Sequence, residues 1–169
     1  SNVENLALVG TAAINGTGNA LDNVLTGNNV ANNLSGGAGN DTLDGRAGID
    51  TLVGGLGGDT YLFGRGYGAD TVVECDASIS NIDIAKFQSG VSADQLWFKR
   101  DLGANNLEVS IIGTADKLTI KDWYASNANH VEQFKTSDGK TLLNSHVQNL
   151  VNAMASFAPP TAGQTSLSS

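Results

Sequence analysis

Aspartates recur at one fixed position of a nine-residue unit that repeats between residues 18 and 73. The units read GNALDNVLT, GNNVANNLS, GGAGNDTLD, GRAGIDTLV and GGLGGDTYL without a break, and RGYGADTVV follows after Phe63 and Gly64. The sixth position holds Asn23, Asn32, Asp41, Asp50, Asp59 and Asp70. Carboxylate and carbonyl oxygens from a flexible loop are ligands for a hard cation, and about 6–8 such oxygens suit Ca²⁺ better than Mg²⁺. The spacing therefore predicts calcium sites along the repeats.

The glycine-rich first six residues of each unit are the candidate ligand loops, because glycine permits positive φ and close approach of the backbone to an ion. The candidate metal-binding residues are Asn23, Asn28, Asn32, Gly36, Gly37, Ala38, Gly39, Asn40, Asp41, Gly45, Arg46, Ala47, Gly48, Asp50, Gly54, Gly55, Leu56, Gly57, Gly58, Asp59, Gly66, Gly68 and Asp70. Successive carbonyls of an extended loop point to opposite sides, so alternate loop positions are expected to face different ions. With one ion per stacked loop pair, we expect about four ions.

The elements that hold these loops follow from the last three residues of each unit, as in 42–44. Their polar, apolar, polar alternation is typical of a very short strand with one inward side chain. One such side chain per unit cannot form a core, so the units must stack. Stacking of alternate units gives two ladders, Leu25–Leu43–Tyr61 and Leu34–Leu52–Val72. It also places loop 36–41 on loop 54–59 and loop 45–50 on loop 65–70, which predicts an all-β, parallel β-roll solenoid.

The register G-G-x-G-x-D-x-U-x resembles that of the RTX (repeats-in-toxin) family, whose nonapeptides form a Ca²⁺-loaded parallel β-roll. Unit 36–44 fits at every position, unit 45–53 departs only at Arg46, and the units at 18 and 27 lack the Asp and the fourth-position Gly. The resemblance implies a secreted bacterial protein, extracellular or at the cell surface, that passes unfolded through a type I secretion apparatus and folds outside. The alternatives are a metal-free Gly/Asn-rich solenoid and a disordered linker.

The chain divides into four predicted zones, of which the roll at 18–73 is the second. A degenerate capping coil at 1–17 precedes the roll. An antiparallel β flank with a C-terminal helix follows it at 74–157, and a flexible tail is expected at 158–169. Alternating apolar residues predict strands within 81–87, 106–111 and 117–121, and Asp138–Gly139 predicts a hairpin turn. The flank, at roughly 88–143, resembles the haemolysin-type calcium-binding-related domain.

A helix is predicted after Asn144. Its apolar residues follow helical spacing, at Val147, Leu150, Val151, Met154 and Phe157. Asn144 or Ser145 is expected to cap its start, and Pro159–Pro160 blocks its continuation. Two interpretations remain: part of a C-terminal export signal, or a helix that packs its apolar stripe on the β flank. We favour the second.

Composition excludes several classes of protein. The net charge is −8, with nine Lys and Arg against seventeen Asp and Glu, so no basic surface for nucleic acid is expected. No apolar run is long enough for a transmembrane segment, and the N-terminal residues lack the pattern of a signal peptide. The single cysteine, Cys75, rules out an internal disulfide and is expected to be a buried small hydrophobe.

The residues that could catalyse a reaction form no recognisable motif. His130 and His146 are too few and too far apart for a two-histidine motif. The remaining candidate carboxylates are expected to be exposed turn residues, at Asp83, Asp94, Asp101, Asp116 and Asp122. Trp97, Trp123 and Tyr124 are expected in the core rather than on a sugar-binding surface.

The sequence therefore predicts a non-catalytic calcium-binding module that follows upstream domains in a larger secreted protein. The alternative is a polysaccharide- or surface-binding module of an extracellular enzyme or adhesin, as the resemblance to RTX-bearing proteins suggests. A glycan array would separate the two.

Overall fold

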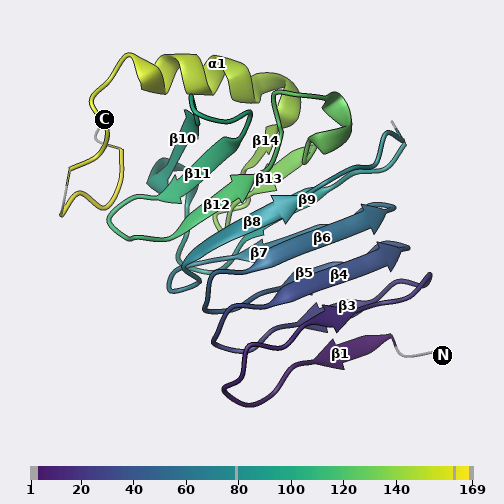
Figure 1. Ribbon diagram of the computed structural model, residues 1–169. Coiled ribbons are helices and arrows are strands. Elements are labelled where there is room, and N and C mark those ends of the chain that lie inside the picture. The colour runs from purple at the N-terminus through teal and green to yellow at the C-terminus, as the bar shows by residue number, and fades with distance from the viewer. Residues whose placement is uncertain (1–3, 79, 162, 168–169) are drawn as a thin grey trace.

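Two seven-stranded sheets face each other along the whole molecule in the computed structural model, which describes residues 4–78, 80–161 and 163–167 (Figure 1). The chain crosses from one sheet to the other after each unit of the roll. The first sheet contains, in spatial order, β1 (Asn5–Ala7), β3 (Val24–Thr26), β5 (Thr42–Asp44), β7 (Thr60–Phe63), β9 (Ile84–Phe87), β13 (Gln133–Lys135) and β14 (Thr141–Leu143). The second contains β2 (Gly16–Thr17), β4 (Asn33–Ala38), β6 (Thr51–Leu56), β8 (Ala69–Val73), β12 (Lys117–Ile120), β11 (Leu107–Ile111) and β10 (Leu96–Arg100).

The two apolar ladders predicted from the repeats are present and form the centre of the roll. In the first sheet Leu25 pairs with Leu43 and Leu43 with Tyr61; in the second Leu34 pairs with Leu52 and Leu52 with Val72. All six side chains are completely buried, and all these strand pairs are parallel. The prediction of a mainly all-β protein built on a parallel β-roll is confirmed.

Both sheets of the roll continue into the C-terminal part of the chain. Strand β9 pairs in parallel with β7, and β13 pairs in parallel with β9. On the other side β12 pairs in parallel with β8, across a gap of more than forty residues in the sequence. The antiparallel pairs β10–β11, β11–β12 and β13–β14 then complete the sheets. The C-terminal strands therefore share both sheets with the roll.

Helix α1 (Asn144–Ala155) lies across the C-terminal end of the sheets, against β10 and β14 (Figure 1). Val147, Val151 and Met154 are buried, as the helical spacing predicts, whereas Phe157 is 69 % exposed and lies outside the stripe. The predicted capping by Asn144 or Ser145 is wrong, because Leu143 occupies the N-cap position and no side chain caps the helix. Two short 3₁₀ turns, Ala93–Gln95 and Asn127–Asn129, precede β10 and β13. No helix in the described ranges is long and apolar enough to cross a membrane.

Trp97, Trp123 and Tyr124 belong to the core or pack against it, as predicted. Trp97 and Trp123 are buried, and Phe98 contacts Phe134 edge-on with ring centroids 5.4 Å apart. Tyr124 is half-buried, beneath the Arg100 guanidinium at 4.3 Å from its ring centroid.

Three features of the structure differ from expectation or extend it. Cys75 is exposed, because it lies in the segment between β8 and β9 and not inside a sheet. Ile14 is also exposed, although Leu8 of the same predicted capping coil is buried. Within the tail, Leu167 packs against the core and its backbone N–H donates to the Asp94 carbonyl oxygen at 2.6 Å.

Candidate calcium sites in two rows of stacked loops

The sixth-position residues lie in two rows, one at each edge of the roll. The first row contains Asn23, Asp41 and Asp59, and the second contains Asn32, Asp50 and Asp70. Each Asp uses Oδ1 to accept a hydrogen bond from the backbone N–H of its counterpart one coil earlier in the row. The distances are 2.7 Å from Asn23 to Asp41, 2.8 Å from Asp41 to Asp59, 2.7 Å from Asn32 to Asp50 and 2.9 Å from Asp50 to Asp70. The loops are therefore held in register by their own carboxylates.

The second carboxylate oxygen of these aspartates has no protein partner. Oδ2 is buried and without a hydrogen bond in Asp41, Asp50, Asp59 and Asp70, and each of these residues is at most 1 % exposed. A buried charged oxygen without a partner costs several kcal/mol unless a cation or donor compensates it. The orphaned oxygens thus fit the calcium that the sequence predicts, and the aspartate side chains supply a negative charge at each coil.

Glycine at the first position of the unit leaves room for that oxygen. A Cβ on Gly36 would lie 2.2 Å from Asp41 Oδ2, and one on Gly54 would lie 2.2 Å from Asp59 Oδ2. In both loops the first and sixth residues are buried, whereas the four residues between them are half-buried or exposed. The loop backbone therefore lies at the surface with one buried carboxylate behind it.

Loop stacking follows the predicted pairs. Gly37 pairs with Gly55 and Ala38 with Leu56, so loop 36–41 lies on loop 54–59, and Gly48 bridges to Gly68 in the other row. The close approach requires glycine, since a Cβ on Gly55 would lie 2.1 Å from the Gly37 carbonyl oxygen. Arg46 occupies the equivalent second position of its unit and keeps a positive φ of 64°, a conformation that is uncommon outside glycine.

In the second row, the loop that follows loop 45–50 departs from the repeat pattern. The register of β5 with β7 places Phe63 where the first-position glycine would stand, and its side chain is completely buried. Asp116 then accepts hydrogen bonds from the backbone N–H groups of Gly66 and Gly68, each at 2.9 Å. This loop is therefore bound by the preceding repeat through Gly48 and Asp50 and, in addition, by a carboxylate from a distant part of the chain.

The two N-terminal coils satisfy their sixth-position residues with hydrogen bonds. Asn32 Oδ1 accepts from the Asn28 backbone N–H at 2.8 Å, and its Nδ2 donates to the Ile14 carbonyl oxygen at 2.7 Å. Asn28 Nδ2 likewise donates to the Ala12 carbonyl oxygen at 2.9 Å, and Asn23 Oδ1 accepts from a backbone N–H four residues earlier. The side-chain amide of asparagine therefore offers N–H donors at the sixth position of these coils, whereas the aspartates of the later coils offer only acceptor oxygens.

Burial raises the pKa of every aspartate in the rows. Burial is the largest cause throughout, and it raises the pKa values of Asp59 and Asp70 to about 7; the pKa values of Asp41 and Asp50 are raised as well. Backbone hydrogen bonds oppose this shift and neighbouring carboxylates add to it. Without a cation, the loop edges are therefore sites where negative charge is unfavourable.

The sequence analysis missed four acidic residues that lie near the rows: Asp83, Asp116, Asp76 and Glu74. Asp83 and Asp116 are 4 % and 6 % exposed, so their assignment as exposed turn residues is wrong. Asp83 Oδ1 accepts from the Asp59 backbone N–H at 2.7 Å, and Asp76 Oδ2 accepts from the Gly57 N–H at 3.0 Å. Asp83 was detectable, because it directly precedes the strand residue Ile84 as Asp59 precedes Thr60.

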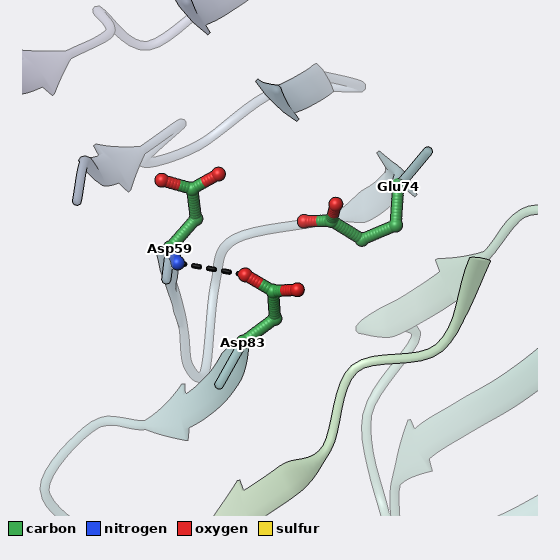
Figure 2. Close-up of side chains that lie close together, drawn as sticks. All are labelled: Asp59, Glu74 and Asp83. Atoms are coloured by element: carbon green, nitrogen blue, oxygen red, sulfur yellow. Dashed lines mark hydrogen bonds between the residues drawn. The ribbon is translucent and has the colours of Figure 1, made fainter. Parts of the chain in front are cut away.

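The fourth missed residue, Glu74, lies with Asp59 and Asp83 at the C-terminal end of the first row (Figure 2). One ligand oxygen from each lies within 4.8 Å of the others, and all three residues are buried. The Tyr61 hydroxyl donates to Glu74 Oε1. Burial raises the pKa of Glu74 to about 9 and that of Asp83 to about 7.

Comparison with known proteins agrees with this geometry. Residues 17–52 and 26–61 match the RTX calcium-binding nonapeptide repeat, a family defined on four copies, and residues 106–145 match the haemolysin-type calcium binding protein related domain. A stretch of 93 residues, 53 % of the chain, is 36 % identical to the iron-regulated protein FrpA of Neisseria meningitidis serogroup C and spans 8 % of that protein's length. The chain therefore carries RTX calcium-binding nonapeptide repeats at 17–61, followed by a haemolysin-type calcium binding protein related domain at 106–145.

Proposed function

We propose that this chain is a calcium-dependent folding module of a larger secreted protein, in which Ca²⁺ between stacked loops completes the roll. The observation that carries the proposal is the pair of rows in which four buried aspartates each leave Oδ2 without a protein partner. Nonapeptide repeats of this family bind Ca²⁺, and the donor set here consists of carboxylate and carbonyl oxygens, which that ion prefers.

The proposed ligands are the loop residues of the Asp-bearing units. Asp41 and Asp59 serve the first row, and Asp50 and Asp70 serve the second, each with backbone carbonyls of the stacked loops. The ion would supply the positive charge that the edges lack, while Oδ1 of each Asp keeps the coils in register. About four ions remain our prediction for the roll. We assign the units at 18 and 27 a capping role, because their asparagines are hydrogen-bonded to backbone groups.

Calcium binding is coupled to folding in this proposal. Glycine has the largest backbone entropy loss on folding, and each unit of the roll buries a single large apolar side chain at its centre. A ligand that binds only the folded state stabilises it by about 2.7 kcal/mol per site at one hundred times its Kd. Millimolar extracellular calcium would then drive folding after passage through a type I secretion apparatus, and upstream domains of the parent protein would be carried with the module.

Polysaccharide or surface binding is the weaker alternative. The aromatic side chains most suited to stacking on a sugar, Trp97 and Trp123, are buried in the core. We propose no catalytic role, since the buried acidic groups lie in the loop rows.

Circular dichroism and isothermal titration of the chelator-treated protein test the proposal. Addition of a few millimolar Ca²⁺ is expected to raise the strand signal with release of heat at several sites per chain, whereas the same concentration of Mg²⁺ leaves the spectrum unchanged. Identical spectra and unfolding temperatures in chelator and in Ca²⁺ would refute calcium-coupled folding.

A further inference from the structure

We propose that Asp59, Glu74 and Asp83 form an additional cation site, built from side-chain carboxylates, that closes the first row and joins the roll to the C-terminal strands. This site goes beyond the loop sites of the proposed function and shares only Asp59 with them.

The register of the second sheet explains why Glu74 belongs to the row. Ser35 pairs with Val53, and Val53 pairs with Val73, so the residues that follow these strands, Gly36, Gly54 and Glu74, are in line. Glu74 thus stands where earlier coils have glycine. Its Oε1 lies 2.8 Å from the position that a Cβ on Gly54 would take, and the Gly54 carbonyl oxygen lies 2.7 Å from the corresponding position on Gly36. This carboxylate therefore takes the place that a loop carbonyl oxygen occupies in the earlier coil.

Each of the three carboxylates comes from a different segment. Asp59 directly precedes β7, Glu74 directly follows β8, and Asp83 directly precedes β9 (Figure 2). Because β7 and β9 belong to one sheet and β8 to the other, an ion held by all three would connect both sheets. It would do so at the place where the nine-residue repeat ends.

Two buried oxygens without partners indicate that a ligand is missing from this cluster. Asp59 Oδ2 and Glu74 Oε2 make no hydrogen bond, and the two residues are 0 % and 3 % exposed. None of the ion pairs formed among the described residues includes these carboxylates. The bond that Tyr61 donates to Glu74 Oε1 leaves the other oxygen uncompensated.

The chemistry of the cluster selects a hard, multiply charged cation. All donors are oxygen, with no histidine or cysteine among them, which disfavours zinc and copper and favours Ca²⁺ or a lanthanide of similar size. The competing explanation is a proton on Glu74, which would remove its negative charge and so relieve the repulsion among the three carboxylates without any ion.

Calcium stoichiometry by equilibrium dialysis separates these explanations. In Glu74→Gln the amide oxygen can still accept the hydrogen bond from the Tyr61 hydroxyl, and in Asp83→Asn it can still accept the one from the Asp59 backbone N–H. Both variants lose the negative charge of the ligand. Each variant is expected to bind one Ca²⁺ fewer per chain than the unchanged protein. Each is also expected to show a smaller rise in unfolding temperature on addition of Ca²⁺.

Two further variants serve as controls. Asp138→Asn alters an exposed hairpin carboxylate and is expected to bind the full number of ions. Asp50→Asn removes a carboxylate from the second row and is expected to lower the stoichiometry independently, so that its loss adds to that of Glu74→Gln in the double variant.

The outcomes are distinct for the two proposals. If Glu74→Gln and Asp83→Asn bind as many ions as the unchanged protein while Asp50→Asn binds fewer, the carboxylate site is refuted and Glu74 is protonated, but the loop sites stand. If none of the variants changes the stoichiometry, the loop sites of the proposed function are refuted as well.

Discussion

Asp70 is bonded to Asp50 through one carboxylate oxygen only: Oδ1 accepts the Asp50 backbone N–H at 2.9 Å, and Oδ2 has no protein partner. The same division between a bonded and an orphaned oxygen recurs in the first row between Asp59 and Asp41. Each aspartate therefore has two separable tasks. One oxygen fixes the spacing of the coils, and the other supplies buried negative charge for a cation.

Substitutions at Asp50 should separate these tasks. Asp50→Asn keeps an oxygen for the Asn32 N–H, whereas Asp50→Ala loses both the hydrogen bond and the charge. Because loop 45–50 is stacked between two other loops, both variants are expected to weaken two neighbouring sites at least about tenfold, or about 1.4 kcal/mol. At saturating Ca²⁺, Asp50→Ala should also be less stable than Asp50→Asn by about 1 kcal/mol, because only Asp50→Ala loses the hydrogen bond.

Isothermal titration and thermal unfolding measure these effects. Asp138→Ala, in the exposed hairpin, is the control and should leave calcium affinity unchanged. Equal affinities for Asp50→Ala and Asp138→Ala would contradict the assignment of Asp50.

The first-position glycines should not tolerate a side chain. In Gly36→Ala the new Cβ would lie 2.2 Å from Asp41 Oδ2, so the carboxylate must turn away from its position. We expect a loss of about 1–3 kcal/mol in the stability of the calcium-loaded protein, in line with overpacking elsewhere. Gly103→Ala is the matched control, since its nearest contact would be 3.6 Å away, and it should change stability by less than about 0.5 kcal/mol. Similar unfolding temperatures for the two variants would contradict this description of the loop.

The stacking of the roll could be predicted from the sequence, but the way in which the roll joins the C-terminal strands could not. The fixed period of nine determines which residues stack, which is why both apolar ladders and the loop pairs were predicted correctly. Asp83 escaped because 24 residues, rather than 18, separate it from Asp59 in the row. The parallel pairing of β12 with β8 is likewise invisible to local periodicity, since nothing in either segment specifies its partner.

The candidate site was predictable to a similar extent. The repeat identified the four aspartates at its sixth position, but Asp83, Glu74 and Asp116 lie outside the repeat register. The burial of a carboxylate depends on what packs around it, and a short acidic segment between strands gives no sign of that. Cys75 illustrates the reverse error, because its apolar character suggested a burial that its place between β8 and β9 does not provide.

Acid should oppose calcium binding. Burial raises the pKa values of Asp59, Asp70 and Asp83 to about 7, against about 3.9 for an unfolded Asp, so protons compete with the ion near neutrality. A carboxylate with a raised folded-state pKa stabilises the metal-free fold below its unfolded pKa, and that contribution is lost as pH rises through about 7. In chelator the roll is therefore expected to be more stable at pH 5 than at pH 8, by the sign of these shifts.

Calcium reverses this dependence, because it binds the ionised carboxylates. Calcium affinity should fall steadily as pH drops from about 8 to about 6. Titrations at several pH values, with unfolding scans in chelator and in Ca²⁺, measure both slopes. A calcium affinity independent of pH over this range would contradict the proposed role of the buried aspartates.

Removal of calcium should unfold the roll while part of the C-terminal region keeps its structure. In the roll from 36 to 73, each unit contributes a single apolar side chain to the centre, and the buried carboxylates repel one another without an ion. The antiparallel strands β10 and β11 and helix α1 instead bury aromatic and aliphatic side chains, among them Trp97, Phe98 and Met154. Metal binding should supply most of the folding free energy of the first region and little of the second.

Amide hydrogen exchange resolves this prediction along the chain. In chelator, amides of 36–73 are expected to exchange rapidly, whereas those of β10, β11 and α1 retain protection; a few millimolar Ca²⁺ should protect both. Strands β9 and β12 are the sensitive positions, because each pairs with a strand of the roll, β7 or β8, on one side. They should gain protection together with the roll, since their hydrogen-bond partners form only then. Equal protection of 36–73 with and without calcium would mean that the roll is a static scaffold.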